Sequence, residues 1–280
     1  MGARSAWRSG RLAAHRPASS AGQRDLLRAV DVMQGWDSVA TLVDGRWIDR
    51  RPRRPEVADL LIMETRVMPW LAPQLPLKVP VPRVVDIEPL VVRHEAVPGR
   101  PVTELTAVHG RQLGAFLQAL HGADVAGAVE HGLRGAEAAL QERRAFLGRF
   151  REVVVPMVTE RAEAEALLDA VEALPADTVV HADLGPEHLL AVGGELTGVI
   201  DFSDAHVGDR AIDLSWLLYG TPPPFAEALA EAYAVTGEER GRALLWHRLG
   251  PWHEVLYGLD TDDPSTVASG LEGVRDRLTS

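Results

Sequence analysis

The spacing of apolar and polar residues changes near residue 98 and divides the chain into an early and a late part. In the early part, residues 39–43 and 46–50 are β-rich runs separated by Asp44-Gly45, a pattern typical of a hairpin. Pro52 and Pro55 end the second run, because proline cannot donate to a sheet ladder. The same patterns predict a helix at 23–33, a helix at 56–71 that Pro69 ends or kinks, and a strand at 89–92.

In the late part, apolar residues recur three and four positions apart, which is typical of helices. Two short strands at 178–180 and 189–192 enclose a polar loop, and Gly193-Gly194 turns the chain into a third strand at 196–202. Strands dominate early and helices late, so we expect an α+β fold with its boundary at 97–99. The expected helices are 110–120, 135–157, 160–174 and a helical region from 213 to the C-terminus.

Composition narrows the class of protein. The 280 residues include 29 Lys plus Arg, 40 Asp plus Glu and no cysteine, with a formal net charge of −11. Without cysteine there are no disulfides, thiolate zinc sites, iron–sulfur clusters or cysteine nucleophiles. The acidic balance argues against a nucleic-acid partner, because phosphate contacts need a surplus of Lys and Arg. Lys78 is the only lysine, so the remaining Lys-plus-Arg cations are all arginine.

The first residues differ from the rest. Residues 1–22 are basic and rich in Ala, Ser and Gly, and they lack the apolar core of a signal peptide, so we expect a flexible basic tail. No apolar run reaches 18 residues, which argues against a membrane span. We therefore expect a cytoplasmic protein.

The densest polar cluster in an apolar setting lies in two late segments. His181, Asp183 and His188 occupy the loop between two apolar strands, and Asp201 follows the apolar run Gly198-Val199-Ile200. Carboxylates in such surroundings are costly unless something pairs with them, and a divalent cation would do so.

The spacing suits phosphoryl transfer, which needs a base near the acceptor hydroxyl and ligands for a metal that bridges the phosphates. Asp183 would accept the proton, His188 and Asp201 would bind the metal, and His181 would hold the loop by hydrogen bonds. Asp204 is either a second neighbour of the metal or a solvated turn residue. Asp209 and Asp213 are expected to cap backbone N–H groups.

The order of these motifs resembles the aminoglycoside/macrolide phosphotransferase family, whose members are relatives of the protein kinases. H-A-D-L-G-P-E-H at 181–188 is similar to the family's catalytic loop, and I-D-F-S-D-A-x-x-G-D at 200–209 is similar to its metal segment. Upstream, W-I-x-R-x-P-R-R-P-E at 47–56, M-E-T-R at 63–66 and P-x-P-R at 80–83 follow the family's order. The resemblance covers residues 25–280, nearly all but the tail.

The resemblance implies a bilobal, protein-kinase-like fold with a β-rich N-lobe at 23–98 and a mainly helical C-lobe at 99–280. The N-lobe would bind the nucleotide, and the C-lobe would carry the catalytic loop, the metal site and the acceptor pocket. The implied reaction moves the γ-phosphoryl group of ATP or GTP, with Mg²⁺, to a hydroxyl of an antibiotic. The implied partners are therefore a nucleotide and a small molecule, and no obligate protein partner is evident.

The resemblance also assigns residues in the N-lobe. Arg50 stands where the family places a strand cation against the nucleotide phosphates, and Glu64 would pair with it from the following helix. Glu95 and Val97 would offer backbone groups to the base at the hinge between the lobes. Ser38 would cover the phosphates.

Three features depart from the family pattern. His188 replaces the commoner Asn, as in macrolide phosphotransferases, which often prefer GTP; a macrolide is thus the first expected acceptor, before an aminoglycoside, nucleoside or peptide antibiotic. Ala182 replaces Gly. Asp49 and Arg51 flank Arg50 where apolar residues are usual, and Asp49 could compete for Arg50 or Arg51.

Two other interpretations stay open. The aromatic stretch 246–258 either packs between helices or lines an acceptor pocket with Trp252, His253, Glu254 and Tyr257. The function could instead be that of a metal-dependent hydrolase, with the two histidines and two aspartates of the polar cluster as ligands, or of a catalytically weak nucleotide-binding pseudokinase. The hydrolase leaves the Arg50 and Glu64 unit without a role, whereas His188 and the residues flanking Arg50 motivate the pseudokinase.

Overall fold

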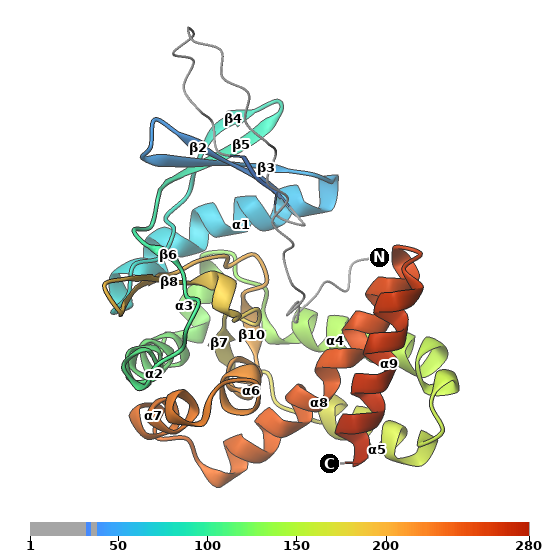
Figure 1. The fold of residues 1–280 in the computed structure, drawn as a ribbon. Helices are drawn as coiled ribbons and strands as arrows, with labels where there is room; N and C mark the ends of the chain where they lie inside the picture. The colour runs from blue at the N-terminus through green and yellow to red at the C-terminus, as the bar shows by residue number, and fades with distance from the viewer. Residues whose placement is uncertain (1–31, 35–37, 280) are drawn as a thin grey trace, which may run out of the picture.

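A computed structural model describes residues 32–34 and 38–279 of the chain. Within these residues, the early part forms a five-stranded antiparallel sheet (Figure 1). Asp44 and Gly45 have φ angles of 55° and 64°, so both adopt the left-handed conformation of a tight hairpin turn. In sheet order, the strands are β1 (Val32–Gln34), β2 (Ser38–Val43), β3 (Trp47–Pro52), β5 (Leu90–Glu95) and β4 (Arg83–Ile87).

One helix, α1 (Pro55–Leu71), covers one face of this sheet. Val57 and Leu61 of α1 pack against Val92 of β5, and all three side chains are fully buried. Arg50 of β3 pairs in register with Val92, so its side chain points to the same helix-covered face. The helix ends two residues after Pro69, close to the predicted end.

The late part is mainly helical and surrounds one apolar core. α2 packs against α7, and α8 packs against both α6 and α9. Thr236 and Glu239 form a capping box at the start of α8. The helices are α2 (Ala107–His121), α3 (Val125–Glu130), α4 (Ala136–Val153), α5 (Arg161–Glu172), α6 (Ala211–Tyr219), α7 (Pro223–Tyr233), α8 (Gly237–Asp260) and α9 (Pro264–Thr279).

Two small sheets lie inside the helical part and hold the polar loop. β7 (Thr178–Val180) precedes the loop and pairs with β10 (His206–Gly208). β8 (Leu189–Val192) follows the loop and lies between β6 (Arg100–Pro101) and β9 (Glu195–Val199). The loop itself contains one short 3₁₀ turn, η3 (Pro186–His188).

Two stretches of chain between the sheet and the helical part meet on β9. We call residues 72–82 the linker and residues 96–99 the hinge. Lys78 of the linker donates its backbone N–H to Thr197 O at 3.2 Å and accepts from Val199 N at 2.9 Å. On the hinge side, the Thr197 hydroxyl donates to the carbonyl oxygen of Pro98. β9 therefore fixes both connections at one place.

Some predicted elements differ from the structure. The helix expected at 23–33 is wrong at its end, because Val32 and Met33 belong to β1 and pair with β2. Residues 23–31 and the expected tail at 1–22 lie outside the described residues. The patterns also missed β4, β10, β6 and α3, which are short or, in the case of β4, exposed along their whole length. Along the described ranges, no helix combines the length and the apolar character that crossing a membrane requires.

Candidate active site

The guanidinium of Arg50 is the centre of a buried polar cluster between the sheet, α1 and the helical part. Its Nη1 donates to both carboxylate oxygens of Glu64 at 2.9 Å, which makes a charge-assisted ion pair. Its Nε donates to Ser38 Oγ at 3.2 Å. Its Nη2 donates to Ser203 Oγ at 2.9 Å and to Asp201 Oδ1 at 3.2 Å. The predicted residues Arg50, Glu64, Ser38 and Asp201 thus come together from three different elements and the segment after β9.

Electrostatics favour the charged forms of Arg50 and Asp201, whereas burial raises the pKa of Glu64 despite its pairing with Arg50. Burial alone would lower the pKa of Arg50, but the carboxylates of Glu64 and Asp201 outweigh burial and raise it. Burial likewise acts to raise the pKa of Asp201, yet Arg50, His188 and the Ser203 hydroxyl lower it to about 2. Asp201 is therefore a carboxylate at neutral pH, with 39% of its side chain exposed.

The backbone at the start of the polar loop is held by one carboxylate. Asp213 in the first turn of α6 accepts the N–H of His181 at 2.9 Å and that of Ala182 at 2.7 Å. His121 Nε2 contacts the same carboxylate at 3.0 Å. Asp213 thus caps loop N–H groups as predicted, and Asp209 accepts the N–H of Ala211 at 3.2 Å. Ala182 has a φ of 67°, a left-handed conformation that favours glycine.

The imidazole of His181 ties this loop to the end of β9. Ile200 O is only an acceptor, so His181 Nε2 carries the proton that it donates over 3.0 Å. Its Nδ1 accepts the backbone N–H of Asp183 at 3.2 Å. Burial lowers the pKa of His181 to about 4, so the ring is neutral at pH 7. His181 therefore holds the loop by these two hydrogen bonds, and its ring carries no charge at neutral pH.

His188 and Asp201 face each other across a gap that suits a cation. His188 Nδ1 lies 2.6 Å from Asp183 O and must donate to it, because a carbonyl only accepts. In the neutral ring, Nε2 then holds a lone pair, and it lies 3.8 Å from Asp201 Oδ2. The Asp201 carboxylate is the kind of ligand that Mg²⁺ prefers, whereas imidazole is a less usual one, and the roles of both residues as metal ligands stay predictions.

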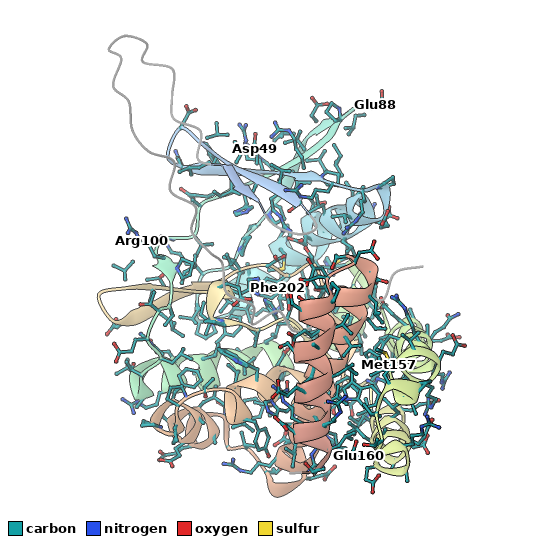
Figure 2. The ribbon with its side chains drawn as sticks, turned by 45° about the vertical axis from the view of Figure 1, so that its right-hand side comes forward. Asp49, Glu88, Arg100, Met157, Glu160 and Phe202 are labelled. Atoms are coloured by element: carbon teal, nitrogen blue, oxygen red, sulfur yellow. The ribbon has the colours of Figure 1, made fainter. Side chains whose placement is uncertain are left out.

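Asp183, the predicted base, lies beside this gap. Its Oδ2 is 3.7 Å from His188 Nδ1, and 25% of its side chain is exposed. The ring of His181 packs against that of Phe202 in a tilted contact, with 4.6 Å between centroids. Figure 2 shows Phe202 in the middle of the molecule, between the sheet and the helical part.

Comparison with known proteins shows which family this chain belongs to. A sequence model of the phosphotransferase enzyme family (APH) matches residues 32–246. The chain belongs to the phosphotransferase enzyme family. No curated protein sequence matches this phosphotransferase.

Solved structures establish the fold of the phosphotransferase as bilobal and protein-kinase-like, as predicted. The GDP and kanamycin complex of APH(2")-IIIa aligns with a TM-score of 0.77 at 21% identity, covering 90% of this chain and 93% of that one. The apoenzyme of macrolide 2'-phosphotransferase MphH from Brachybacterium faecium aligns at 0.68 and 24% identity, covering 88% and 91%. ADP-bound APH(2'')-Ib aligns at 0.66 and 18% identity, covering 90% and 95%.

One residue that the sequence reasoning missed belongs to the buried cluster around Arg50. Ser203 accepts from Arg50 and donates to Glu64 Oε1 at 2.7 Å, so it joins the two lobes. Ser203 stands two positions after Asp201 in the I-D-F-S motif. Its place in that motif is the signal in the sequence that could have found it.

Asp49 does not compete for Arg50. Successive side chains of a strand point to opposite faces, so Asp49 lies on the face away from α1. There it accepts from Arg93 of β5 at 2.5 and 2.8 Å, and its second cation, Arg51, is 3.9 Å away. The hydrogen bonds from Arg93 lower the pKa of Asp49. Figure 2 shows Asp49 on the outer side of the sheet.

Glu95 is the last residue of β5, and Val97 follows it in the hinge. The Glu95 side chain is exposed and pairs with Arg46 at 3.2 Å. Its carbonyl accepts from His94 Nδ1 at 2.8 Å, and the N–H of Ala96 is bonded to Arg46 O at 2.7 Å. Val97 follows at the boundary between the lobes. The base-binding roles of Glu95 and Val97 stay predictions.

The aromatic stretch lies mostly in the core. Trp252 is completely buried and packs against Phe150 at 5.6 Å between centroids, which matches the packing interpretation and leaves no ring surface for an acceptor. His253 packs against the same phenylalanine at 4.9 Å, and burial lowers its pKa to about 4. Glu254 and Tyr257 are partly exposed, and their acceptor role stays a prediction.

Two further expectations concern metal binding, namely the role of Asp204 and the four-ligand cluster of the hydrolase alternative. The carbonyl of Asp204 accepts from His206 Nδ1 at 2.7 Å and from Arg134 Nη2 at 3.2 Å, and a role beside a metal stays a prediction. Over residues 32–34 and 38–279, no group of three or more His, Asp or Glu side chains is arranged to hold a metal ion. The four-ligand cluster that the hydrolase alternative requires is therefore not assembled there.

Proposed function

We propose that this phosphotransferase moves the γ-phosphoryl group of ATP or GTP to a hydroxyl of an antibiotic and so confers resistance. The observation that carries the proposal is the buried cluster that joins Arg50, Glu64 and Asp201 across the two lobes, beside the loop that bears Asp183. Phosphoryl transfer needs little from the protein beyond positioning and charge stabilisation, which such a cluster can supply.

In this proposal, Asp183 accepts the proton of the attacking hydroxyl. The hydroxyl oxygen forms a bond to the γ-phosphorus while the bond to the β–γ bridging oxygen breaks, and the nucleoside diphosphate leaves. Arg50 binds the phosphates with Ser38 beside it, Glu64 and Ser203 orient Arg50, and His181 holds the loop. Glu95 and Val97 bind the base.

His188 and Asp201 would hold Mg²⁺, since they direct an imidazole lone pair and a carboxylate into one gap. When bound, Mg²⁺ would neutralise charge on the phosphates. A macrolide is the first candidate acceptor because His188 stands where macrolide phosphotransferases carry histidine. Aminoglycosides and nucleoside or peptide antibiotics follow. Asp204, Glu254 and Tyr257 are the candidate acceptor contacts.

Asp183→Asn tests the proposal most directly. The amide keeps the shape of the side chain but cannot accept the hydroxyl proton, so we expect kcat to fall at least 100-fold, within the usual range for a general base. The affinity for Mg²⁺–nucleotide should stay within about threefold of the original protein. Antibiotics would be screened with both nucleotides, and transfer would be followed by mass spectrometry of the acceptor.

Asp59→Asn is the matched control, because Asp59 is an exposed residue of α1 outside the site. This control should transfer at the rate of the original protein. Retained turnover in Asp183→Asn contradicts the proposed base. Nucleotide binding without transfer to any hydroxyl acceptor, in the original protein, favours the pseudokinase alternative instead.

A further inference from the structure

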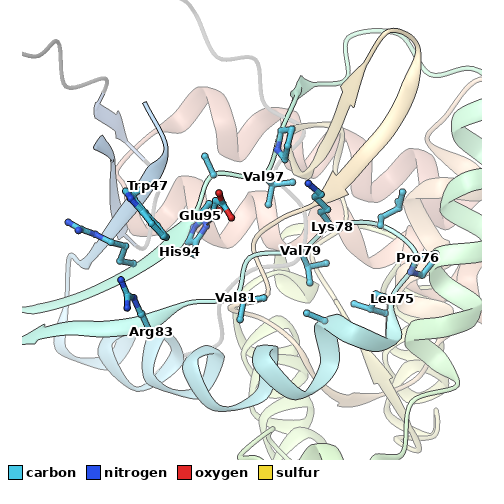
Figure 3. Close-up of a pocket in the computed structure, with 15 residues that line it drawn as sticks. Trp47, Leu75, Pro76, Lys78, Val79, Val81, Arg83, His94, Glu95 and Val97 are labelled. Atoms are coloured by element: carbon cyan, nitrogen blue, oxygen red, sulfur yellow. Dashed lines mark hydrogen bonds between the residues drawn. The ribbon is translucent and has the colours of Figure 1, made fainter. Parts of the chain in front are cut away.

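A pocket of about 600 Å³ opens behind the hinge, where the linker and the hinge approach each other (Figure 3). This volume is within the range of small-molecule binding sites. β3, β4 and β5 contribute one wall of the pocket, and the linker and the hinge contribute the rest. The lining residues used below are Trp47, Lys78, Val79, Arg83, Arg93 and Val97.

The pocket shares Glu95 and Val97, the residues proposed to bind the base, with the site described above. It is lined by none of the residues that meet at Arg50, nor by the catalytic loop. Trp47 and Arg93 lie on the sheet face opposite Arg50, because they alternate with Ile48 and Val92 along β3 and β5. A molecule in this pocket and a nucleotide against Arg50 would therefore occupy different faces of the sheet.

The walls combine positive charge with apolar surface. Arg93 and Glu95 are already paired, with Asp49 and Arg46 respectively. In the described part of the chain, Lys78 and Arg83 have no carboxylate partner, and the Arg83 guanidinium lies 5.7 Å from the centroid of the Trp47 ring. Two available cations therefore face one cavity.

Apolar side chains fill the space between these cations. Val79 of the linker is buried and Val97 of the hinge is partly buried, and both line the pocket, with the indole of Trp47 on the sheet side. A phosphate or other fully polar ion would leave this surface in contact with water. A ligand with an apolar ring and one anionic group would match these walls, since the ring would cover the apolar side chains and the anion would meet Lys78 or Arg83.

The pocket is joined to the catalytic strand by backbone bonds. Lys78 pairs with β9 on both sides of Gly198, through its own N–H and C=O. β9 continues directly into Ile200, whose N–H is bonded to His188 O at 3.0 Å, and then into Asp201. A shift of Lys78 would therefore be transmitted to both proposed metal ligands through contiguous backbone.

We propose that the pocket behind the hinge is a second binding site, for a small aromatic anion such as an aromatic carboxylate, and that its occupancy changes nucleotide affinity through Lys78 and β9. Coupling between two sites is reciprocal, so nucleotide must change the affinity for the anion by the same factor. The site is independent of which antibiotic the protein modifies.

Calorimetric titration with 2-naphthoate tests the site in the full chain. We expect saturable one-to-one binding that persists when Mg²⁺–ADP or Mg²⁺–GDP is saturating, and at least tenfold weaker binding of the uncharged 2-naphthamide. The double substitution Lys78→Gln and Arg83→Gln should raise the Kd for 2-naphthoate at least tenfold. The backbone bonds of Lys78 do not depend on its side chain, so this variant keeps the fold, which its Tm and nucleotide binding verify.

Arg111→Gln is the matched control, since Arg111 is an exposed cation of α2 outside the pocket, and its Kd should be unchanged. Saturating 2-naphthoate should shift the nucleotide Kd at least threefold in the original protein and leave it unshifted in the double variant. Displacement of 2-naphthoate by nucleotide with simple competition, or equal binding to the double variant, would overturn the second site. An unshifted nucleotide Kd in the original protein, with 2-naphthoate bound, would overturn the coupling.

Discussion

Arg50 shows how one side chain can be specified by the number of its donors as well as by its charge. The guanidinium reaches two serines and two carboxylates at once, from a planar group with donors on three nitrogens. A lysine ammonium has three donors at a single point and cannot reach acceptors spread over such a plane. The cluster is therefore built for arginine, although the family pattern allows lysine at this position.

Arg50→Lys should accordingly weaken both the fold and the nucleotide site. The ammonium keeps one ion pair, leaving buried oxygens of Ser38, Ser203 or Asp201 unsatisfied, so we expect the free energy of unfolding to fall by about 2 kcal/mol. The Kd for Mg²⁺–nucleotide should rise about tenfold, or ~1.4 kcal/mol. Urea denaturation and calorimetry measure the two effects.

Arg151→Lys provides the comparison, because Arg151 contacts Glu165, Asp169 and Glu172 within the helical part, far from the nucleotide site. This variant should lose some stability and keep its nucleotide affinity. Equal nucleotide affinity in Arg50→Lys and the original protein would contradict the role of Arg50.

Among the elements, β9 is the strand to which both the linker and the hinge are bonded. Its residue Gly198 lies where the linker and the hinge both approach, and a Cβ at this glycine would collide with the Val97 side chain and come within 2.6 Å of Lys78 O. Real Cβ atoms do not approach a carbonyl oxygen so closely. The absence of a side chain at 198 is what allows the two connections to converge on one strand.

Gly198→Ala should therefore separate β9 from the linker. We expect the free energy of unfolding to fall by about 2–3 kcal/mol, as for other overpacked sites. Nucleotide affinity should fall as well, because Asp201 follows the same strand. Gly148→Ala in α4 is the control: its Cβ would meet no other atom within 4 Å, and alanine favours a helix over glycine. If thermal melting showed no difference between the two variants, the packing at Gly198 would be irrelevant.

Elements with local signals were predictable. The hairpin of β2 and β3 follows from Asp44-Gly45, and β7 and β8 follow from short apolar runs around a polar loop. β10 pairs with β7, a strand far away in the sequence, and no local pattern reveals such a pairing. β4 pairs with its neighbour β5, but it is exposed along its whole length and so lacks the apolar alternation of a half-buried strand. The helix expected through residue 33 gives way to β1, since pairing with β2 overrides a helical spacing.

The site was predictable as far as motif order reached. The resemblance named Arg50, Glu64 and Asp201, and the structure brings them together. It did not reveal Ser203, nor that Arg93 takes Asp49, because both depend on which residues meet across the sheet and between lobes. The aromatic stretch was ambiguous because an apolar helix face looks alike in a core and in a pocket.

At the scale of the whole molecule, histidines with a lowered pKa contribute to the response to acid; among them His181 is fully buried, and His206, His247 and His253 are half-buried. His181, His206, His247 and His253 each have a pKa of about 4, in each case chiefly because burial disfavours the charged ring. In the unfolded chain the pKa of each of these histidines returns to its ordinary value of 6.5. Between pH 6.5 and 4 the unfolded state binds more protons, so the free energy of unfolding falls as the pH falls through this window.

His253→Phe isolates one such contribution. Phenylalanine fits the aromatic contacts of His253 with Phe146 and Phe150 and carries no proton. Urea denaturation at pH 7.5 and pH 5 should show that the loss of unfolding free energy on acidification is smaller by about 2 kcal/mol in this variant. The same loss in both proteins would mean that His253 is not held neutral by the fold.

The convergence of the linker and the hinge on β9 also sets an order of events during synthesis. Thr197 emerges from the ribosome 99 residues after Pro98, and Asp201 emerges 151 residues after Arg50. Until then, a nascent N-lobe lacks the strand that anchors its two connections and one of the carboxylates that neutralise its buried guanidinium. The N-lobe is thus completed by a part of the chain made much later, and the two lobes mature as one folding unit although the sheet and helices look like separate bodies.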